Sequence, residues 1–563
     1  MGVLISIMKH IYKLFFVILL QFTLGSFAQM KLPNPITAGF YPDPAICKVG
    51  SDYYLVNSTF VYFPGIPVLH SKDLKNWKQI GSVIDRPSQM DFMGERVSRG
   101  LFAPAINYHN GLFYVTCTDI DNGGNFVVTA KNPAGPWSDP VWLKEVRGID
   151  PSLFFDGDKA YIIYNSNPPE NKSLYNGHRT LRMYEFDPVN LKVVGEETLL
   201  VNGGVDISKK PVWIEGPHIY KRDGWYYIMA AEGGTAINHS EVILRSKEVR
   251  GPYIPYEKNP ILTQRHLDPN RKNPITSTGH ADLVEGPDGN TYAVFIAVRP
   301  YEGDFYNTGR ETFIAPVKWV DGWPIINPDH QEVQYSYSVP WKEVKQKDAL
   351  PMNGNFSYTE DFNGSSLSKD FLFLRTHNPS WYNLKNGSLT LNLLPATAQE
   401  LGNPAFVGKR QQHLTCEAST ELSFSAKTDN EKAGMLIFQG ETNFYYICKS
   451  QAEGKDAIQL YKSNRETKKN DLIKQVILNK PADKVFFKIA ADKDKYSFYY
   501  GLKKDNWQVL QDNVDGKFLS TRVAGGFVGS LFALYATSEG QSTDSKASYN
   551  WFSYAGNDEV YNK

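Results

Sequence analysis

Cysteine is scarce in this chain. Its 563 residues include four, at positions 47, 117, 416 and 448, with no Cys-x-x-Cys pair and no His/Cys cluster. This scarcity argues against a zinc centre and against a dense disulfide framework. All four thiols lie in apolar strand-like stretches, which favours buried free cysteines. A bridge between Cys416 and Cys448 on neighbouring strands is the alternative.

Net charge is absent as well. The 60 basic residues balance 60 acidic ones, and no basic stripe is present that would follow a phosphate backbone. We therefore expect no nucleic-acid partner. Helical periodicity is almost absent and low-complexity tracts are not evident, so the sequence predicts strands separated by turns.

The amino terminus has the features of an export signal. Lys9 and Lys13 flank the start of an apolar run at 14–20, and Ser26-Phe27-Ala28 has small residues where a leader peptidase needs them. Residues 1–28 thus match a cleaved secretory signal, and an uncleaved membrane anchor is the alternative. We expect a periplasmic or secreted protein without membrane attachment after cleavage.

A repeated pattern occurs five times in the first two-thirds of the chain. Each copy has a short apolar motif, then a turn with Gly, Asp or Asn, then an aromatic-rich strand. The motifs are Asp43-Pro44-Ala45-Ile46, Ala103-Pro104-Ala105-Ile106, Asp150-Pro151-Ser152-Leu153, Glu215-Gly216-Pro217-His218-Ile219 and His280-Ala281-Asp282-Leu283. The strands are 52–56, 111–115, 159–163, 224–228 and 290–294. The copies start about 47 to 65 residues apart, the length of one four-stranded sheet, which predicts a five-bladed β-propeller.

A second domain follows the repeats. The segment near 339–360 is polar and rich in turns, and strands beyond it alternate with period two but lack the motif. We predict an all-β protein with a five-bladed β-propeller at 29–345 and a β-sandwich at 355–560.

Acidic residues lie at the start of three copies. If equivalent strand starts converge on the propeller axis, Asp43, Asp150 and Glu215 meet in one pocket. An Asp before Pro is by itself more often a turn residue than a catalyst. Glu215, however, is surrounded by apolar neighbours, which raise a carboxyl pKa as a general acid requires. Three converging carboxylic groups therefore favour acid/base catalysis.

Hydrolysis of a glycosidic bond needs one protonated and one ionised carboxyl group. A third carboxylate beside the acid would keep the pKa of the acid high through like-charge repulsion. His280 starts the fifth copy and would face the same cavity, as a structural histidine or as a ligand for metal or water. Arg310 follows that copy and could bind vicinal sugar hydroxyls, pair with a carboxylate, or form a surface salt bridge.

These motifs resemble glycoside hydrolase family 43, the five-bladed β-xylosidases and α-L-arabinofuranosidases. The resemblance rests on residues 34–44, 57–67, 148–153, 214–218 and 278–283. Longer members carry a carboxy-terminal sandwich of the concanavalin A type, a jelly roll, so the resemblance covers the whole mature chain. Residues 525–529 and 549–552 resemble the closing strands of that sandwich.

The resemblance assigns roles to residues of this chain. It implies that Asp43 is the general base, that Glu215 is the general acid, and that Asp150 tunes the pKa of the acid and orients it. The family inverts the anomeric configuration, so a water would lie between Asp43 and the anomeric carbon. No cofactor is required for this chemistry.

Four further residues are implied to contact substrate. Arg310 resembles an arginine that binds substrate hydroxyls, and Phe60 resembles a ring that lines the innermost sugar subsite. His280 resembles the central histidine, which in some members lies against a calcium ion. The second blade often begins Trp-Ala-Pro in the family but Phe102-Ala103-Pro104 here, and Phe102 alters the wall of the sugar pocket.

The sequence therefore predicts an exported, inverting exo-glycosidase. Its substrates would be oligosaccharides or polysaccharides that contain pentoses, such as xylan, arabinoxylan or arabinan, and it would remove terminal β-D-xylose, α-L-arabinofuranose or both. The alternative is a glycan-binding protein without turnover, for which aromatic walls and an arginine would suffice. A hydrolase of fructans is disfavoured. The five-bladed hydrolases of fructans carry their acid in a Glu-Cys pair, whereas the acid here stands in Glu215-Gly216-Pro217.

Overall fold

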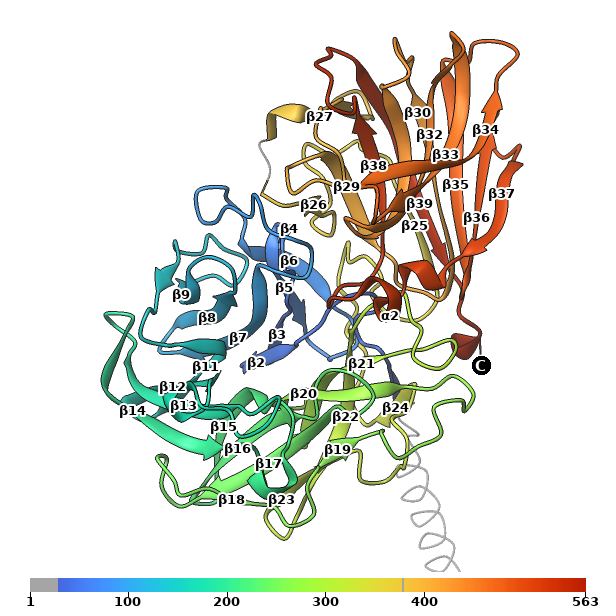
Figure 1. Cartoon of the computed structure of the whole chain (residues 1–563). Helices are drawn as coiled ribbons and strands as arrows, with labels where there is room; N and C mark the ends of the chain where they lie inside the picture. The colour runs from blue at the N-terminus through green and yellow to red at the C-terminus, as the bar shows by residue number, and fades with distance from the viewer. Residues whose placement is uncertain (1–28, 377–378, 563) are drawn as a thin grey trace, which may run out of the picture.

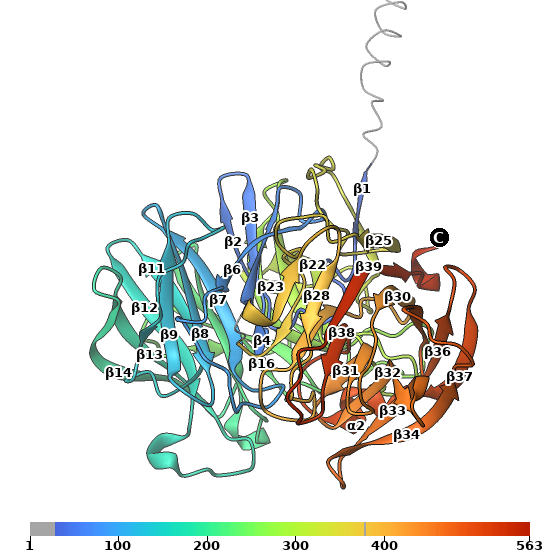
Figure 2. The same ribbon diagram turned by 90° about the horizontal axis from the view of Figure 1, so that it is seen from above.

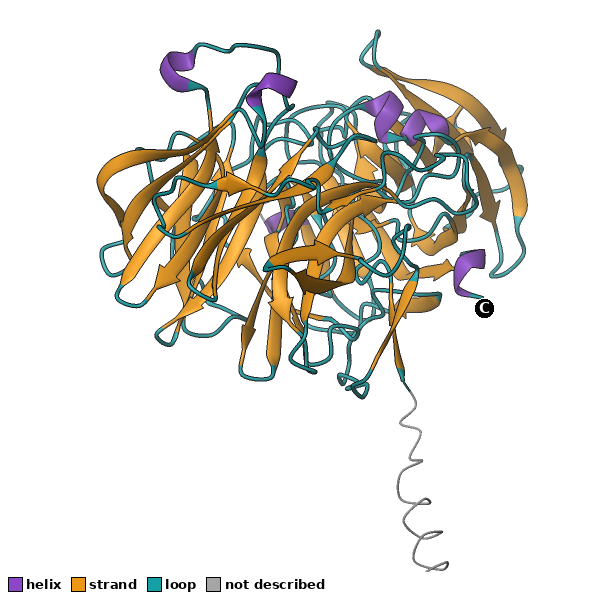
Figure 3. Ribbon diagram, turned by 90° about the horizontal axis from the view of Figure 1, so that it is seen from below, coloured by secondary structure: helices purple, strands orange, loops and turns teal. Residues whose placement is uncertain are grey.

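The chain forms two bodies built almost entirely of strands, a propeller coloured blue to green and a sandwich coloured yellow to red (Figure 1). The computed structural model describes residues 29–376 and 379–562, and the expected secretory signal at 1–28 lies outside them. Seen from above, the two bodies lie side by side (Figure 2). Helix is confined to a few short turns (Figure 3). No helix in the described ranges is long and apolar enough to cross a bilayer.

Five antiparallel sheets form the blades of the propeller, as the repeat predicts. In blade I the strand order is β2 (Ala45–Val49), β3 (Asp52–Val56), β5 (Gly65–Ser71) and β6 (Lys78–Ile84). Blade II has β7 (Leu101–His109), β8 (Leu112–Asp119), β9 (Gly124–Ala130) and β10 (Val141–Trp142). Blade III has β11 (Gly148–Asp156), β12 (Lys159–Ser166), β13 (Thr180–Asp187) and β14 (Lys192–Asn202).

The remaining two blades complete the ring. Blade IV has β15 (Glu215–Arg222), β16 (Trp225–Glu232), β17 (Ser240–Ser246) and β18 (Ile254–Pro255), with β19 (Leu262–Thr263) also paired to β17. Blade V has β20 (Thr276–Glu285), β21 (Thr291–Val298), β22 (Glu311–Val320) and β23 (Trp323–Ile326). Separate apolar clusters fill the spaces between neighbouring blades, such as the cluster of Ile163, Met183 and Ile228 from blades III and IV. The aromatic strands of the repeat are the second strands of the blades, and their buried faces supply these clusters.

In four of the five blades the first strand is distorted where it carries the motif. The pairing register shifts at Phe102/Ala105, Ile149/Ser152, Glu215/His218 and Gly279/Asp282 in blades II to V. A β-bulge leaves a backbone N–H out of the ladder, so a proline is tolerated there. The bulges therefore explain why Pro104, Pro151 and Pro217 recur in strands. They also re-aim the neighbouring side chains.

The second body is a sandwich of two antiparallel sheets. One sheet has the order β27 (Tyr382–Leu384), β28 (Leu389–Asn392), β39 (Lys546–Gly556), β30 (Thr415–Ser423), β35 (Lys484–Asp492), β36 (Lys495–Gly501) and β37 (Gln508–Asp515), with β25 (Phe356–Glu360) also on β39. The other has β29 (Ala405–Arg410), β38 (Leu531–Thr537), β31 (Lys432–Gly440), β32 (Asn443–Ala452), β33 (Lys455–Asn464) and β34 (Lys469–Ile477). Aliphatic and aromatic residues from both sheets form the core between them.

One sequence expectation about this domain was wrong, and one alternative is excluded. Residues 525–529 form an irregular loop before β38, not a closing strand, whereas 549–552 do lie in the last strand, β39. Cys416 lies on β30 and Cys448 on β32, in different sheets and not on neighbouring strands. All four cysteines are free thiols, as favoured from the sequence.

Strand β1 (Met30–Pro33) pairs with β24 (Ser336–Val339), so the two ends of the propeller segment lie together. A second short pairing joins the two bodies: β26 (Phe373–Leu374) of the second domain pairs with β4 (Tyr62–Phe63) of the propeller. One continuous apolar cluster runs from blades I and II into the sandwich. The loop at 525–529 follows a one-turn helix, α2 (Thr521–Ala524). Short 3₁₀ turns are Pro169–Asn171, Ile207–Lys209, Pro379–Trp381, Lys517–Leu519 and Glu559–Tyr561.

Candidate active site

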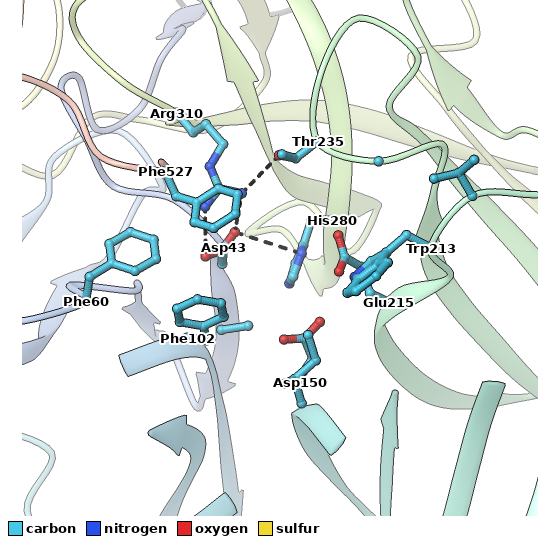
Figure 4. Close-up of a pocket in the computed structure, with 14 residues that line it drawn as sticks. Asp43, Phe60, Phe102, Asp150, Trp213, Glu215, Thr235, His280, Arg310 and Phe527 are labelled. Atoms are coloured by element: carbon cyan, nitrogen blue, oxygen red, sulfur yellow. Dashed lines mark hydrogen bonds and ion pairs between the residues drawn. The ribbon is translucent and has the colours of Figure 1, made fainter. Parts of the chain in front are cut away.

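A cavity of about 330 Å³ lies where the five motifs converge (Figure 4). All seven side chains proposed from the sequence as catalytic or substrate-binding line it, and they come from all five blades. They are Asp43, Phe60, Phe102, Asp150, Glu215, His280 and Arg310. The other lining residues are Ala103, Ile149, Val212, Trp213, Gly234, Thr235 and Phe527. The fold therefore gathers the predicted set in one place.

The five motifs share an unusual backbone conformation. Asp43, Ala103, Asp150, Gly216 and His280 all have positive φ, between 21° and 57°. Asp and His tolerate this left-handed region better than most residues do. In blade IV the position equivalent to Asp43 and Asp150 is thus Gly216. The sequence repeat had placed Glu215 there, so that alignment was wrong by one residue. A Cβ at Gly216 would lie 2.8 Å from His280 Nε2, so only glycine fits there.

Asp43 is held as a carboxylate. Arg310 places Nη1 at 3.0 Å from Oδ1 and Nη2 at 3.4 Å from Oδ2, and Ser58 Oγ donates to Oδ2 at 2.6 Å. Burial by itself would raise the pKa of Asp43, but the Arg310 charge and the Ser58 hydrogen bond outweigh it. The net result is a pKa below the ordinary value of 3.8. Asp43 is therefore ionised and suited to accept a proton.

Glu215 has the opposite environment. Burial, followed by the charges of Asp150 and Asp43, raises its pKa well above 4.5. Burial and Asp43 also raise the pKa of Asp150, to about 7. The main-chain N–H of Gly216 donates to Asp150 Oδ2 at 3.0 Å and so stabilises the charged form of Asp150. We infer that the proton of this pair resides on Glu215.

His280 is a neutral ring in the floor of the cavity. Burial lowers its pKa to about 4, despite the nearby Asp43 carboxylate. Its Nδ1 lies 3.9 Å from Asp43 Oδ1, and its ring packs against the Cα of Gly216. His280 thus adds a wall, and a group that can form hydrogen bonds, without adding charge.

Few carboxylate oxygens near His280 are free to hold a calcium ion. Calcium prefers six to eight oxygen ligands, whereas the Asp43 oxygens are already engaged by Arg310 and Ser58. Among the described residues, no group of three or more His, Cys, Asp or Glu is placed to hold a metal ion. Calcium at His280 stays a prediction, and we derive no chemical step from it.

Three phenylalanine rings form the opposite wall. The ring centroids of Phe60 and Phe102 lie 5.5 Å apart, edge to face, and Phe527 stacks on Phe60 at 6.1 Å. The Arg310 guanidinium lies 5.2 Å from the centre of the Phe527 ring. Such a wall suits the apolar C–H face of a sugar, while Arg310 and the acids face its hydroxyls.

Of the seven lining residues outside the predicted set, three have large or polar side chains that bear on the chemistry of the site: Phe527, Thr235 and Trp213. Phe527 belongs to the sandwich domain, and nothing in its local sequence indicates that it reaches a propeller cavity. Thr235 accepts a hydrogen bond from Arg310 Nη1 at 3.1 Å and comes from a loop without a motif. Trp213 stands two residues before Glu215. That short spacing was the one feature of the sequence that could have placed Trp213 in the cavity.

Comparisons with known proteins agree with this geometry. Residues 32–324 match Glycosyl hydrolases family 43, and residues 359–555 match the Beta xylosidase C-terminal Concanavalin A-like domain. A xylosidase/arabinosidase of Butyrivibrio fibrisolvens is 38% identical over 533 residues, which cover 92% of this chain and 98% of that protein. The non-reducing end alpha-L-arabinofuranosidase BoGH43B of Bacteroides ovatus is 37% identical, covering 94% and 96% of the two chains.

Solved structures show the same architecture. The Bacteroides ovatus Xyloglucan PUL GH43B structure has a TM-score of 0.83 and 36% identity, and covers 93% of this chain and 99% of that one. A GH43_12 protein from the capybara gut metagenome has a TM-score of 0.84 and 38% identity, with 92% and 96% covered. Both similarities extend through propeller and sandwich.

Proposed function

This chain belongs to glycosyl hydrolases family 43, and from that membership we propose that it is an exported exo-glycosidase that inverts anomeric configuration. Its substrates are oligosaccharides or polysaccharides that end in β-D-xylose or α-L-arabinofuranose. The observation that carries the proposal is the opposed protonation of two acids in one cavity, with Asp43 ionised beside Arg310 and Glu215 protonated beside Asp150.

Asp43 acts as the general base. Its carboxylate takes a proton from a water molecule while the water oxygen attacks the anomeric carbon from the face opposite the leaving group. Arg310 and Ser58 fix both oxygens of this carboxylate, so it is oriented before the substrate binds. The base is thereby kept charged in a buried site without a metal ion.

Glu215 acts as the general acid. It gives its proton to the glycosidic oxygen as the bond to the anomeric carbon breaks, so the leaving sugar departs as a neutral alcohol. The negative charge of Asp150 opposes early loss of that proton. After the reaction Asp43 holds the proton from water, and exchange with solvent restores both groups.

The shape of the cavity supports removal of terminal sugars. Phe527, from the sandwich, stands over Phe60 and Arg310 and closes the side of the cavity that faces the second domain. A volume of about 330 Å³ is suited to one or two sugar units and not to a long polymer segment. Export is supported by the signal-like residues 1–28.

The test is hydrolysis of aryl β-D-xyloside and aryl α-L-arabinofuranoside by the mature protein and by its Glu215→Gln variant. We expect turnover of at least one substrate, with a loss of about 10²- to 10⁴-fold in the variant. The loss should be smaller for leaving groups that need little protonation. Proton NMR of the first-formed sugar should show the inverted anomer. Absence of turnover by the folded wild-type protein, or a retained anomer, would contradict the proposal.

A further inference from the structure

Trp213 occupies a special place beside the acid. It lines the cavity and its backbone has φ of 58°, a left-handed conformation that is rare for a bulky residue. Its main-chain N–H donates to Gly177 O at 2.8 Å, which holds the strand entry in that conformation. The Trp213 side chain lies beside the Glu215 carboxyl group, and its presence there lowers the pKa of that group (Figure 4). The only donor on a tryptophan side chain is the indole N–H, so this N–H is the group that can favour the charged form of Glu215.

Arg179 braces the same indole. Its guanidinium carbon lies 3.8 Å from the centre of the Trp213 ring, and its Nη1 donates to Asn167 Oδ1. Arg179 stands outside the set of described residues that line the cavity, so it supports the indole from behind. A cation over an indole face is the strongest form of this contact. Trp213 is therefore fixed by three contacts: Gly177, Glu215 and Arg179.

A polar groove lies over blade III, next to Arg179. It has a volume of about 630 Å³, and Asn167, Arg182, Tyr184 and Glu197 are among its lining residues. Gly148 pairs with Ser166 in the register of β11 and β12, so the groove begins beside the strand start that carries Asp150. Asn167 contacts Arg179 and also lines the groove, and thus connects the groove to the residue that supports the Trp213 indole.

We infer that Trp213, braced by Arg179, forms the binding site for the sugar that leaves, and that it positions Glu215 against the glycosidic oxygen. This inference rests on the proposed role of Glu215 as general acid. The oxygen that receives the proton must lie within hydrogen-bond reach of the Glu215 carboxyl group. Trp213 lies beside that carboxyl group and lines the same cavity, so the leaving sugar has to lie against the indole.

The chemistry of the pair fits a sugar ring. The indole offers a flat apolar face to the C–H groups of a pentose or hexose, as aromatic walls do in carbohydrate sites. Farther out, the amide, guanidinium, phenol and carboxylate groups of the groove offer hydrogen bonds to hydroxyls. The leaving side of the substrate would then extend over blade III as a short oligosaccharide, while the terminal pentose remains enclosed by the phenylalanine wall.

The experiment compares substrates with and without a leaving sugar. Xylobiose is paired with β-D-xylopyranosyl fluoride, and α-1,5-L-arabinobiose with α-L-arabinofuranosyl fluoride; fluoride needs neither a sugar subsite nor full protonation. The variants are Trp213→Ala, Trp213→Phe and Arg179→Met. Arg222→Met is the matched control, because Arg222 covers the Trp319 ring at 4.4 Å at the other end of β15.

We expect Trp213→Ala to lower kcat/KM for the disaccharide about 10- to 100-fold and for the fluoride less than about threefold. Arg179→Met should give a smaller loss of the same kind, and Arg222→Met should change neither substrate. Trp213→Phe keeps a ring but removes the N–H that favours the charged form of Glu215. It should therefore move the basic limb of the pH profile for the disaccharide to higher pH.

The outcomes separate this inference from the proposed function. Equal losses on disaccharide and fluoride, or an unmoved basic limb in Trp213→Phe, would show that Trp213 is only structural and would overturn the inference. Failure of the unaltered protein to hydrolyse any of the four substrates would instead overturn the proposed function. If Trp213→Ala does not fold, Trp213→Phe and Arg179→Met still decide the question.

Discussion

Ser98 of the propeller accepts a hydrogen bond at 2.8 Å from the main-chain N–H of Phe527, a residue of the sandwich. This contact holds the Phe527 ring over Phe60 and Arg310, so the second domain supplies part of the sugar pocket of the first. The approach is close: a Cβ on the preceding residue, Gly526, would lie 2.3 Å from Ser98 Oγ. The loop at 525–529 can occupy this place only with glycine at 526.

Gly526→Ala should displace Phe527 and weaken substrate binding. The new methyl group would push against Ser98, and a shift of about 1 Å in a wall residue can cost up to about 10²-fold in catalysis. We expect a raised KM and a fall of about tenfold or more in kcat/KM on aryl glycosides. Gly525→Ala is the control, because Gly525 has a similar φ of 78° but a Cβ added there would meet no atom within 4 Å. Similar kinetics for the two variants would argue against the Ser98 contact as the cause.

Asp43→Asn should abolish activity whatever the leaving group. The amide cannot accept the proton of the attacking water, so we expect kcat to fall about 10²- to 10⁴-fold on both aryl glycosides and glycosyl fluorides. Glu215→Gln should spare the fluorides, because fluoride departs without full protonation. Steady-state rates on both substrate types check the assignment. A variant of Asp43 that retains fluoride hydrolysis would exclude its role as base.

Asp150→Asn should narrow the pH range over which the enzyme is active, by lowering its upper limit. The Asp150 charge raises the pKa of Glu215, so its removal lowers that pKa, and the acid loses its proton at lower pH. The basic limb of kcat/KM should therefore shift to lower pH, whereas the acid limb, set by Asp43 below pH 3.8, should stay. Asp156→Asn, at the other end of β11, should leave both limbs in place. An unchanged basic limb in Asp150→Asn would contradict the proposed tuning.

Arg299→Met should destabilise the protein. Arg299 is fully buried, donates to both oxygens of Glu311 at 2.6 and 2.9 Å, and pairs with Asp558 of the second domain at 2.7 Å. Its removal leaves two buried carboxylates without a partner cation, which costs about 3–5 kcal/mol. Denaturant unfolding followed by tryptophan fluorescence should show the lower stability. Lys318→Met, which breaks the exposed pair with Asp329, should have little effect.

The blade repeat could be predicted from the sequence because it depends on local properties of the chain. Alternating aromatic residues between turn residues predicted the second strands, and 52–56 coincides with β3. The convergence of Asp43, Asp150 and His280 followed from the repeat, since equivalent strand starts meet at the axis of a propeller. The sandwich loop at 525–529 was mistaken for a strand because its apolar residues pack against the propeller and not into a sheet.

The position of the acid was misjudged by one residue for a similar reason. The repeat aligns Glu215 with Asp43 by charge, whereas the bulge in β15 places Gly216 at the equivalent left-handed position. The place of this bulge depends on the strand that pairs with β15 and on the space beside His280. Neither can be predicted from the local sequence pattern.

The sequence by itself determined the all-β architecture, the five blades and the residue types of an acid/base site, because strand periodicity, turn chemistry and motif spacing are local properties. Only the tertiary structure decided which acid is charged and which side chains complete the pocket. The pKa values of Asp43 and Glu215 depend on burial and on charges more than 60 residues away in the chain. Phe527 and Ser98, separated by more than 400 residues, meet because two domains pack against each other.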